Sequence, residues 1–528
     1  MLVSLLASPG LSAAATLQVA AGGDFQAALN AARPGDVIVL QAGARFVGAF
    51  QLPAKPSGPV ITIQSSAALP ARRVTPADAP LMPTIASGSV QSAITAIGVS
   101  NWRLDGLRFE SNSTGQGDVI ALQDATNIVM DRLLIVAAPQ GQRRGVLGNG
   151  RQITLTRSHI AQIWRSGQDS QAFCAWDGAG PYTITDNYLE AASENVMFGG
   201  ADSRSSDRVP ADILVERNHF SKPWEWQGQS RNVKNLFELK AAKRVTVRNN
   251  VFERNWTDGQ TGWAIVLTPR NQDGTAPWSV VEDVLFERNV VRDTFNGINV
   301  SGSDDIHPSG RTTRITIRHN LFQLLDGSFL QIGAEAGEVT IDHNTVLGVR
   351  WRIAMLTRGT LWENGVKRSA TYSARPFRFT NNLTPHGEYG VFGDGVSAVG
   401  TNALAILTPG YTWTHNVVAG GSQSFPAVTW RPSLQQFAAQ FDAASQLVAT
   451  SVYRGAATDG KDVGVHWDPA LPRIPRATPN GPVLTGRNAP VWTPGRPFLV
   501  AALSGVAPVR RRARGSRARR RRSATASA

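Results

Sequence analysis

The sequence predicts an all-β solenoid, in which short strands repeat coil after coil around one elongated core. Three observations predict it. A six-residue segment of alternating apolar residues that ends in Asn recurs along the chain, and a second short apolar segment recurs between its copies. The chain also has 528 residues. This exceeds the roughly 100–200 residues of an ordinary domain, so the chain forms either several domains or one repetitive domain.

The asparagine segments define the coils. Alternation over five residues indicates a strand with one buried face. Successive asparagines are 24 to 39 residues apart, which is enough for several strands and variable loops in each coil. Because equivalent residues of stacked coils lie about 4.8 Å apart, we expect these asparagines to form an internal column whose amides bond along the stack. The copies are Tyr182-Thr-Ile-Thr-Asp-Asn187, Ile213-Leu-Val-Glu-Arg-Asn218, Val245-Thr-Val-Arg-Asn-Asn250, Val284-Leu-Phe-Glu-Arg-Asn289, Ile315-Thr-Ile-Arg-His-Asn320, Val339-Thr-Ile-Asp-His-Asn344, Phe377-Arg-Phe-Thr-Asn-Asn382 and Tyr411-Thr-Trp-Thr-His-Asn416, and weaker copies without Asn end at Leu107, Leu133 and Ser158.

The second repeated segment supports the same stacking. Its first and third residues are apolar and are expected to point into the core, while the residues between them point outward. Glu238 and Lys240 are therefore expected on the outer, solvent-facing side. The inward residues that open the segments are Phe173, Val196, Phe237, Ile265, Ile298 and Leu330, and the outward ones include Cys174, Met197, Glu238, Val266 and Asn299.

The two ends of the repeat have recognisable patterns. Residues 22–32 have the spacing of an amphipathic helix and lead into a strand at 37–40, and residues 434–441 also have helical apolar spacing and are expected to cover the open end of the stack. Together with the repeats and the closing segment 453–464, the chain resembles the right-handed parallel β-helix proteins of the pectin-lyase-like superfamily over residues 16–470. The resemblance implies a single-stranded right-handed parallel β-helix with an N-terminal capping helix. It implies no single activity, because that superfamily includes lyases, hydrolases, isomerases, epimerases and binding proteins.

Sequence outside the repeat indicates export and a basic tail. Residues 1–15 resemble the later part of a secretory signal, without its positive start. Residues 471–528 are Pro-rich and contain nine arginines between Arg510 and Arg522. These arginines account for nine of the fourteen net positive charges, so the net charge of the rest of the chain is only +5. We expect a disordered tail, with nucleic-acid binding limited to nonspecific phosphate contacts. Cys174 is the single cysteine, so no intrachain disulfide forms.

Candidate catalytic residues lie on the outer side of the second segment. Glu238 and Lys240 share a face, and Arg270 follows the residue stacked on Lys240 one coil later. A lyase that acts on acidic sugars must neutralise a uronate carboxylate and remove the adjacent proton. Lys240 as base, Arg270 as carboxylate clamp and Glu238 as tuning partner would meet these needs. The alternative is that they are surface charges in an exposed salt bridge.

Candidate substrate-binding residues surround this trio. The longest insertions fall between Asn187 and Asn320 and are rich in tryptophan, whose faces suit sugar rings. Core packing is the alternative role for about half of these rings. The predicted substrate-binding residues are Glu194, Asn299, Trp224, Trp226, Trp256 and Trp263.

Function remains open between three classes at this stage. We expect a secreted, periplasmic or cell-surface monomer without a membrane span that acts on a polysaccharide, first as a lyase and second as a glycoside hydrolase using Glu194, Glu238 or Asp258. A non-catalytic glycan-binding solenoid would show the same grooves. No cofactor is expected; Ca²⁺ at Asp304, Asp305 and His307 is the open alternative to turn chemistry there.

Overall fold

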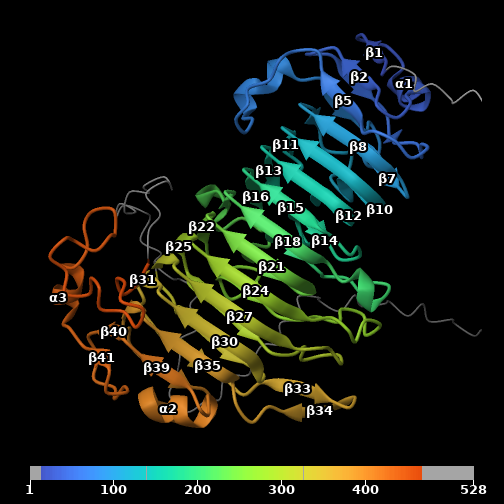
Figure 1. Ribbon diagram of the computed structural model, residues 1–528. Coiled ribbons are helices and arrows are strands. Elements are labelled where there is room, and N and C mark those ends of the chain that lie inside the picture. The colour runs from blue at the N-terminus through green and yellow to red at the C-terminus, as the bar shows by residue number, and fades with distance from the viewer. Residues whose placement is uncertain (1–13, 138, 325, 466–528) are drawn as a thin grey trace, which may run out of the picture. The chain divides into compact units, whose positions relative to one another are not determined.

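The computed structural model describes residues 14–137, 139–324 and 326–465, all of which belong to the unit Met1–Pro490. Successive strands run through three faces and return to the first face one coil further along, so that neighbouring coils pair in parallel (Figure 1). The fold is the predicted parallel β-helix. The predicted signal segment 1–15, apart from Ala14 and Ala15, and the predicted linker and tail 471–528 lie outside the described residues.

The first face contains the strands that end just before the asparagines. Its strands pair in register along the stack, so that Ile184 lies beside Val215 and Val215 beside Val247. Its members are β1 (Thr16–Val19), β2 (Val37–Leu40), β5 (Ile61–Ser65), β8 (Ser100–Asp105), β10 (Asp118–Asp131), β12 (Arg144–Thr156), β15 (Tyr182–Thr185), β18 (Ala211–Glu216), β21 (Ala242–Arg248), β24 (Val281–Glu287), β27 (Thr312–Arg318), β30 (Ala336–Asp342), β35 (Ala374–Thr380) and β39 (Thr412–Thr414).

The second face contains the other repeated apolar segment. The long strands β10 and β12 belong to both the first and the second face and join them into one sheet of 25 strands among the described residues. The remaining members are β4 (Phe50–Gln51), β7 (Ile94–Ile97), β14 (Gln171–Ala175), β17 (Glu194–Phe198), β20 (Asn235–Leu239), β23 (Trp263–Leu267), β26 (Asn296–Ser301), β29 (Leu330–Gly333), β32 (Ala354–Leu356), β37 (Val391–Gly393) and β38 (Ala398–Val399).

The third face is a separate sheet of 14 strands in the described chain. It follows the asparagine corner in each coil. Its members are β3 (Arg45–Val47), β6 (Thr84–Ala86), β9 (Arg108–Phe109), β11 (Leu134–Val136), β13 (His159–Ile163), β16 (Tyr188–Ala191), β19 (His219–Ser221), β22 (Val251–Asn255), β25 (Val290–Thr294), β28 (Leu321–Leu324), β31 (Thr345–Leu347), β36 (Leu383–Pro385), β40 (Asn416–Ala419) and β41 (Thr429–Trp430).

The predicted asparagine column is present. From Asn218 to Asn416, each side-chain Oδ1 accepts two hydrogen bonds of 2.9–3.2 Å from the preceding asparagine, one from its backbone N–H and one from its Nδ2. Ser158 precedes Asn187 in the same column, since its N–H donates to Asn187 Oδ1 at 2.8 Å. The column therefore extends to a coil whose sequence lacks Asn.

The core lies between the three faces. Phe173, Val196 and Phe237 pair in register and are fully buried, and the same holds for the residues stacked after them. This confirms the inward column predicted from the second repeated segment. The other members of that column are Ile265, Ile298 and Leu330.

Helices and a closing segment complete the two ends of the stack. At the N-terminal end, α1 (Phe25–Ala31) buries Phe25 and Leu29 in the core, as predicted for a capping helix (Figure 1). Near the C-terminal end, α2 (Gly400–Leu407) buries one face in the same core, and the sequence analysis did not anticipate it. The predicted helix α3 (Leu434–Ala438) packs Phe437 beside Leu383 of the third face.

The outer side of the second face differs from the expectation. Its outward residues were expected to face solvent, but Glu238 is 3% exposed and Cys174 is fully buried. The loops that follow strands of the second face bond to one another. Trp278 Nε1, in the loop after β23, donates to Ser203 Oγ, in the loop after β17, at 2.9 Å. Loops joined in this way close a face that strand alternation alone would leave open.

A hairpin of β33 (Thr360–Glu363) and β34 (Val366–Ser369) projects from the stack (Figure 1). It contacts the loop after β26, because Trp362 Nε1 donates to the carbonyl of Asp304 at 3.1 Å. None of the described helices combines the length and apolar character required to cross a membrane.

Candidate functional site

The predicted catalytic residues meet at the ends of β20 and β23. Lys240 directly follows β20, and the backbone N–H of Arg270 donates to the Lys240 carbonyl at 2.8 Å. Glu238 pairs with Met197 on one side and with Val266 on the other, which places it in the outward row. The stacking predicted from the repeats therefore brings Glu238, Lys240 and Arg270 into one cluster.

Glu238 and Lys240 form an ion pair on the outward side of the second face. Lys240 Nζ lies 3.6 Å from Glu238 Oε1, and the Lys240 side chain is 15% exposed against 4% for Glu238. The other carboxylate oxygen of Glu238 accepts from Asn235 Nδ2 at 3.4 Å. The Lys240 side chain thus keeps limited contact with solvent, while the hydrogen bond from Asn235 holds the Glu238 carboxylate in place. This pair is more enclosed than the exposed salt bridge that was the alternative interpretation.

Arg270 is held by the loop after β26. Its Nη1 lies 2.6 Å from Asp304 Oδ1 and 3.0 Å from Asp305 Oδ1. Asp304 is fully buried and its carboxylate also accepts the backbone N–H groups of Asn271 and Ile306, each at 2.8 Å. The position of the guanidinium is therefore fixed before any substrate arrives.

These contacts also bear on the Ca²⁺ alternative. Two of the three candidate ligands, Asp304 and Asp305, already neutralise Arg270, and His307 Nδ1 lies 2.8 Å from the Asn271 carbonyl. Across residues 14–465, apart from the two omitted positions, no three His, Cys, Asp or Glu side chains are placed to hold a metal ion. The donor set in this loop does not fit a cation, and we derive no chemical step through one.

Glu194 lies at the start of β17, fully buried. Gln171 Nε2 donates to its Oε2 at 2.8 Å, and Lys234 Nζ lies 3.6 Å from its Oε1. Burial raises the pKa of Glu194 to about 7, although Lys234 and Lys240 act in the opposite direction. Asp169 lies 2.5 Å from Lys234 Nζ and shares this cation. Glu194 is thus a carboxyl group that can hold a proton near neutral pH.

A line of hydrogen bonds leads to Glu194 along the second face. Arg144, Gln171 and Glu194 occupy one register row on successive strands. Arg144 Nη1 donates to Asp118 Oδ1 at 2.7 Å and Arg144 Nε donates to Gln171 Oε1 at 3.0 Å. Gln171 is therefore oriented by Arg144 to donate its amide to Glu194. This line fixes the Glu194 carboxyl group from the N-terminal side of the stack.

The predicted tryptophans pack mainly against one another. Trp226, Trp256 and Trp263 are each less than 10% exposed, and Trp224 is half-buried with its ring 5.4 Å from that of Trp256. Trp224, Trp226 and Trp256 belong to a small apolar cluster outside the main core that also includes Trp164. Packing accounts for the buried rings, and sugar stacking on the more exposed Trp224 stays a prediction.

Two acceptors beside Lys240 lack partners. Asn299 Oδ1 and Thr268 Oγ1 are buried and bond to no other described group. Asn299 pairs with Val266 and belongs to the same outward row as Glu238. The Thr268 N–H donates to the carbonyl of Leu239, the residue before Lys240. Buried polar atoms without partners require a water molecule or a ligand.

Sequence reasoning did not find Lys234, Gln171, Arg144 or Asp169. Gln171 and Arg144 could have been found by extending the register row of Glu194 backward through the repeats. Lys234 and Asp169 lie in loops whose path the repeat does not determine, so no sequence signal pointed to them.

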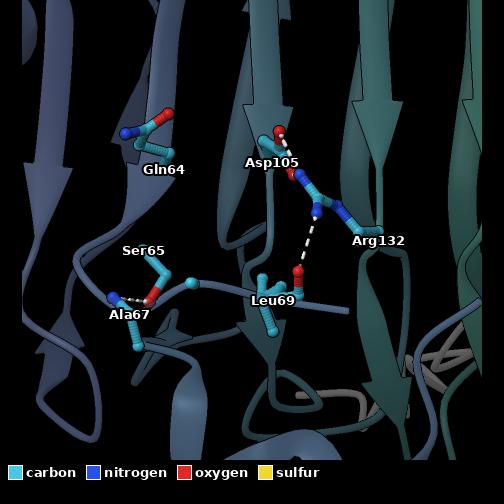
Figure 2. A pocket seen from close by; sticks show the side chains of 7 residues that line it. Gln64, Ser65, Ala67, Leu69, Asp105 and Arg132 are labelled. Carbon is cyan, nitrogen blue, oxygen red and sulfur yellow. Dashed lines mark hydrogen bonds and ion pairs between the residues drawn. The ribbon is translucent and has the colours of Figure 1, made fainter. Parts of the chain in front are cut away.

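A pocket of about 260 Å³ lies elsewhere, on the N-terminal coils (Figure 2). Arg132 and Asp105 line it side by side as an ion pair of 2.7 Å, and Arg132 Nη1 also bonds to the Leu69 carbonyl. Its charged groups therefore neutralise each other, and it contains none of the predicted site residues. The lining residues are Gln64, Ser65, Ala67, Ala68, Leu69, Asp105 and Arg132.

Comparison with solved structures supports the fold. The chain has a right-handed parallel β-helix fold. Among solved structures it is similar to the PL6 family alginate lyase AlyGC, with a TM-score of 0.54 and 15% identity over 87% of this chain. The chain spans 59% of the length of that lyase. At this identity the similarity establishes the fold alone.

Two further solved structures are more distant. A mannuronic acid specific family 6 polysaccharide lyase from human gut microbiota has a TM-score of 0.49 and 14% identity, with coverage of 80% of this chain and 91% of that one. A GH87 α-1,3-glucanase from Streptomyces thermodiastaticus strain HF3-3 has a TM-score of 0.45 and 13% identity, with coverage of 79% and 71%. No protein-family model and no curated protein matches the sequence significantly.

Proposed function

We propose that this chain is an extracellular polysaccharide lyase that cleaves a uronate-containing glycan by β-elimination. The observation that supports it most lies at the end of β20: Lys240 retains contact with solvent, Glu238 lies 3.6 Å away, and the Arg270 backbone N–H bonds to the Lys240 carbonyl while Asp304 fixes the Arg270 guanidinium. A protein that only binds glycans has no need of a base and a fixed guanidinium placed together.

The reaction assigns a role to each residue. Lys240 is the base that takes the proton from the carbon next to the uronate carboxylate. Arg270, whose Nη1 is bound by Asp304 and Asp305, offers its remaining N–H donors to the negative charge that develops on that carboxylate. The carbon–carbon double bond then forms as the glycosidic carbon–oxygen bond breaks, and the departing oxygen takes a proton from water. Lys240 gives its proton to the hydroxide that remains, which restores both the base and the water molecule. Glu238 orients Lys240 between turnovers.

Glycoside hydrolysis is the second candidate, and one observation favours it. Glu194 holds a proton near neutral pH because burial raises its pKa to about 7, and Glu238 is among the charges that act on it. A protonated carboxyl group near an ionised one is the pattern of an acid and its partner in hydrolases. Glu194 would then protonate the leaving oxygen.

A panel of uronate-containing and neutral glycans separates these functions. The purified protein is incubated with each glycan, and both the absorbance of unsaturated uronates and the new reducing ends are followed. Elimination produces both signals in parallel. Reducing ends without the absorbance indicate hydrolysis, and binding without either signal indicates a glycan-binding protein.

The Lys240→Ala variant then tests the site. We expect elimination to fall by at least 10²-fold, the usual contribution of a general base. Lys243→Ala is the matched control, because Lys243 lies three residues on, in the first-face strand β21, and its activity should equal that of the unmodified protein. Undiminished turnover in Lys240→Ala would remove Lys240 from the mechanism.

A further inference from the structure

The loop between β19 and β20 holds an arginine in a fixed orientation on a tryptophan. The guanidinium carbon of Arg231 lies 3.3 Å from the ring centroid of Trp164. Arg231 Nε and Nη2 both donate to Gln229 Oε1, at 3.1 and 2.8 Å. Stacking and this pair of hydrogen bonds fix the plane of the guanidinium. Both Arg231 and Trp164 remain half-exposed at the rim of the second face.

The third nitrogen of this guanidinium has no acceptor. Arg231 Nη1 is buried and bonds to no other group in the described chain, and Arg231 takes part in none of the ion pairs found there. Gln227 Nε2, in the same loop, is a second buried donor without an acceptor among these residues. Leaving buried donors unpaired is costly, so an acceptor that the described chain does not supply would stabilise this loop.

The surroundings favour a negatively charged acceptor. Arg143, in the loop before β12, has a buried Nε without a described partner, and Arg165 lies next to Trp164. Asp169 is already taken by Lys234, at 2.5 Å, and by Asn232, at 2.9 Å. Glu225, in the same loop as Arg231, is exposed, and the buried Arg231 Nη1 does not bond to it.

This rim and the catalytic cluster belong to one stretch of chain. Lys234 precedes β20 and Lys240 follows it, so the two ammonium groups mark the two ends of one strand. An extended strand rises about 3.3 Å per residue, so the rim lies roughly 15–20 Å from Lys240 along the strand direction. A glycan that crosses β20 would therefore reach Arg231 several sugar units away from Lys240.

We propose that Arg231, stacked on Trp164, binds a carboxylate on a sugar distant from the bond that is cleaved. The inference rests on the proposed function and adds to it a substrate class: a glycan with uronate carboxylates on several sugars, and not one acidic sugar in a neutral chain. Arg231 donates Nη1 to the distant carboxylate, and Gln227 supplies a second donor.

Steady-state kinetics on uronate oligosaccharides of different length test the subsite. A charged hydrogen bond contributes about 1.5–3 kcal/mol, so Arg231→Leu should raise KM for an octasaccharide by about tenfold or more. Its kcat, and both constants for a trisaccharide too short to reach the rim, should not change. Arg231→Lys should restore only part of the loss, because lysine lacks the planar fork that Trp164 supports. Arg217→Leu is the matched control, because Arg217 is a half-exposed arginine that pairs with Asp186 on another face.

Calorimetry with the same octasaccharide separates the two proposals, using Lys240→Ala so that binding does not depend on turnover. Binding that weakens with Arg231→Leu in this background supports the subsite even if the unmodified protein cleaves nothing. If the protein cleaves the octasaccharide with a KM that Arg231→Leu does not change, Arg231 does not form a subsite. The lyase assignment then stands, and the unpaired donors bind water. Absence of both binding and cleavage overturns both proposals. Thermal melting of each variant verifies folding.

Discussion

The ammonium group of Lys234 lies 3.6 Å from a carboxylate oxygen of Glu194 that is buried and accepts no hydrogen bond among the described residues. Burial raises the pKa of Glu194 from 4.5 to about 7 in spite of this cation. In the unfolded chain the group ionises at its ordinary, lower pKa. The raised pKa therefore costs no stability below about pH 4.5, and its cost grows as the pH rises from about 4.5 to about 7 and stays constant above that.

Replacing Glu194 by Gln tests this relationship. The amide cannot ionise, so the melting temperature of the unmodified protein should fall relative to that of Glu194→Gln as the pH is raised from 5 to 8. Thermal melting of both proteins across this range measures the difference. Glu110→Gln serves as control at a partly exposed ion pair. Parallel melting curves for Glu194→Gln and the unmodified protein would show that Glu194 is ionised at both ends of the range.

The asparagine column predicts a large effect from one buried amide. Asn250→Ala removes the acceptor for Asn218 and the donors to Asn289 Oδ1 and the Val215 carbonyl, all of them buried. Each buried polar group left without a partner costs roughly 1–3 kcal/mol, so we expect a clear loss in the free energy of unfolding, measured with urea. Thr246→Ala, at a half-buried outward position of the preceding strand β21, should change it by no more than about 0.5 kcal/mol.

The two carboxylates on Arg270 should differ in importance. Asp304 is fully buried, whereas the Asp305 side chain is 33% exposed, although both lie within 3.0 Å of Nη1. Removing one partner of a buried pair costs about 3–5 kcal/mol, while an exposed pair contributes at most about 1 kcal/mol. Asp304→Asn should therefore lower the melting temperature by many degrees, and Asp305→Asn should have little effect. Equal effects would show that Asp304 does not hold Arg270.

Repetition explains which features the sequence could predict. Stacking depends only on strand period and register, so it located the asparagine column, the inward column from Phe173 to Leu330, and the proximity of Lys240 and Arg270. The column also extends to Ser158, whose backbone N–H donates to Asn187 Oδ1 and whose hydroxyl accepts from the Leu133 N–H.

Loops explain what the sequence could not predict. Burial of Glu238 and Cys174, the packing of Trp226 and Trp256, and the contact of Lys234 with Glu194 all depend on insertions of different length. An insertion has no equivalent in the next coil, so register gives no information about where its side chains lie. Strand alternation alone therefore predicted an open face where the folded chain has a closed one.

An acid-sensitive cluster lies on the outer side of the third face. Glu253 lies 2.9 Å from His219 Nε2 and 2.6 Å from Arg292 Nη2. Burial alone would raise the pKa of Glu253, but the hydrogen bonds and charges of His219 and Arg292 outweigh it and bring the pKa to about 2. A carboxyl group with a lowered pKa stabilises the folded state above its ordinary pKa of 4.5, and that stabilisation is lost as the pH falls toward 2.

Arg292→Leu should therefore destabilise the protein in a pH-dependent way. Near pH 6 the variant leaves Glu253 with His219 as its remaining strong partner, so its melting temperature should fall below that of the unmodified protein. Near pH 3 the difference should shrink, because the carboxylate that Arg292 stabilises is then partly protonated in the variant and in the unfolded chain alike. Arg314→Leu is the control, since its partners Glu282 and Asp283 are more exposed and an exposed pair contributes little. A melting difference that stays constant from pH 6 to pH 3 would mean that Arg292 acts through packing of its side chain and not through the charge of Glu253.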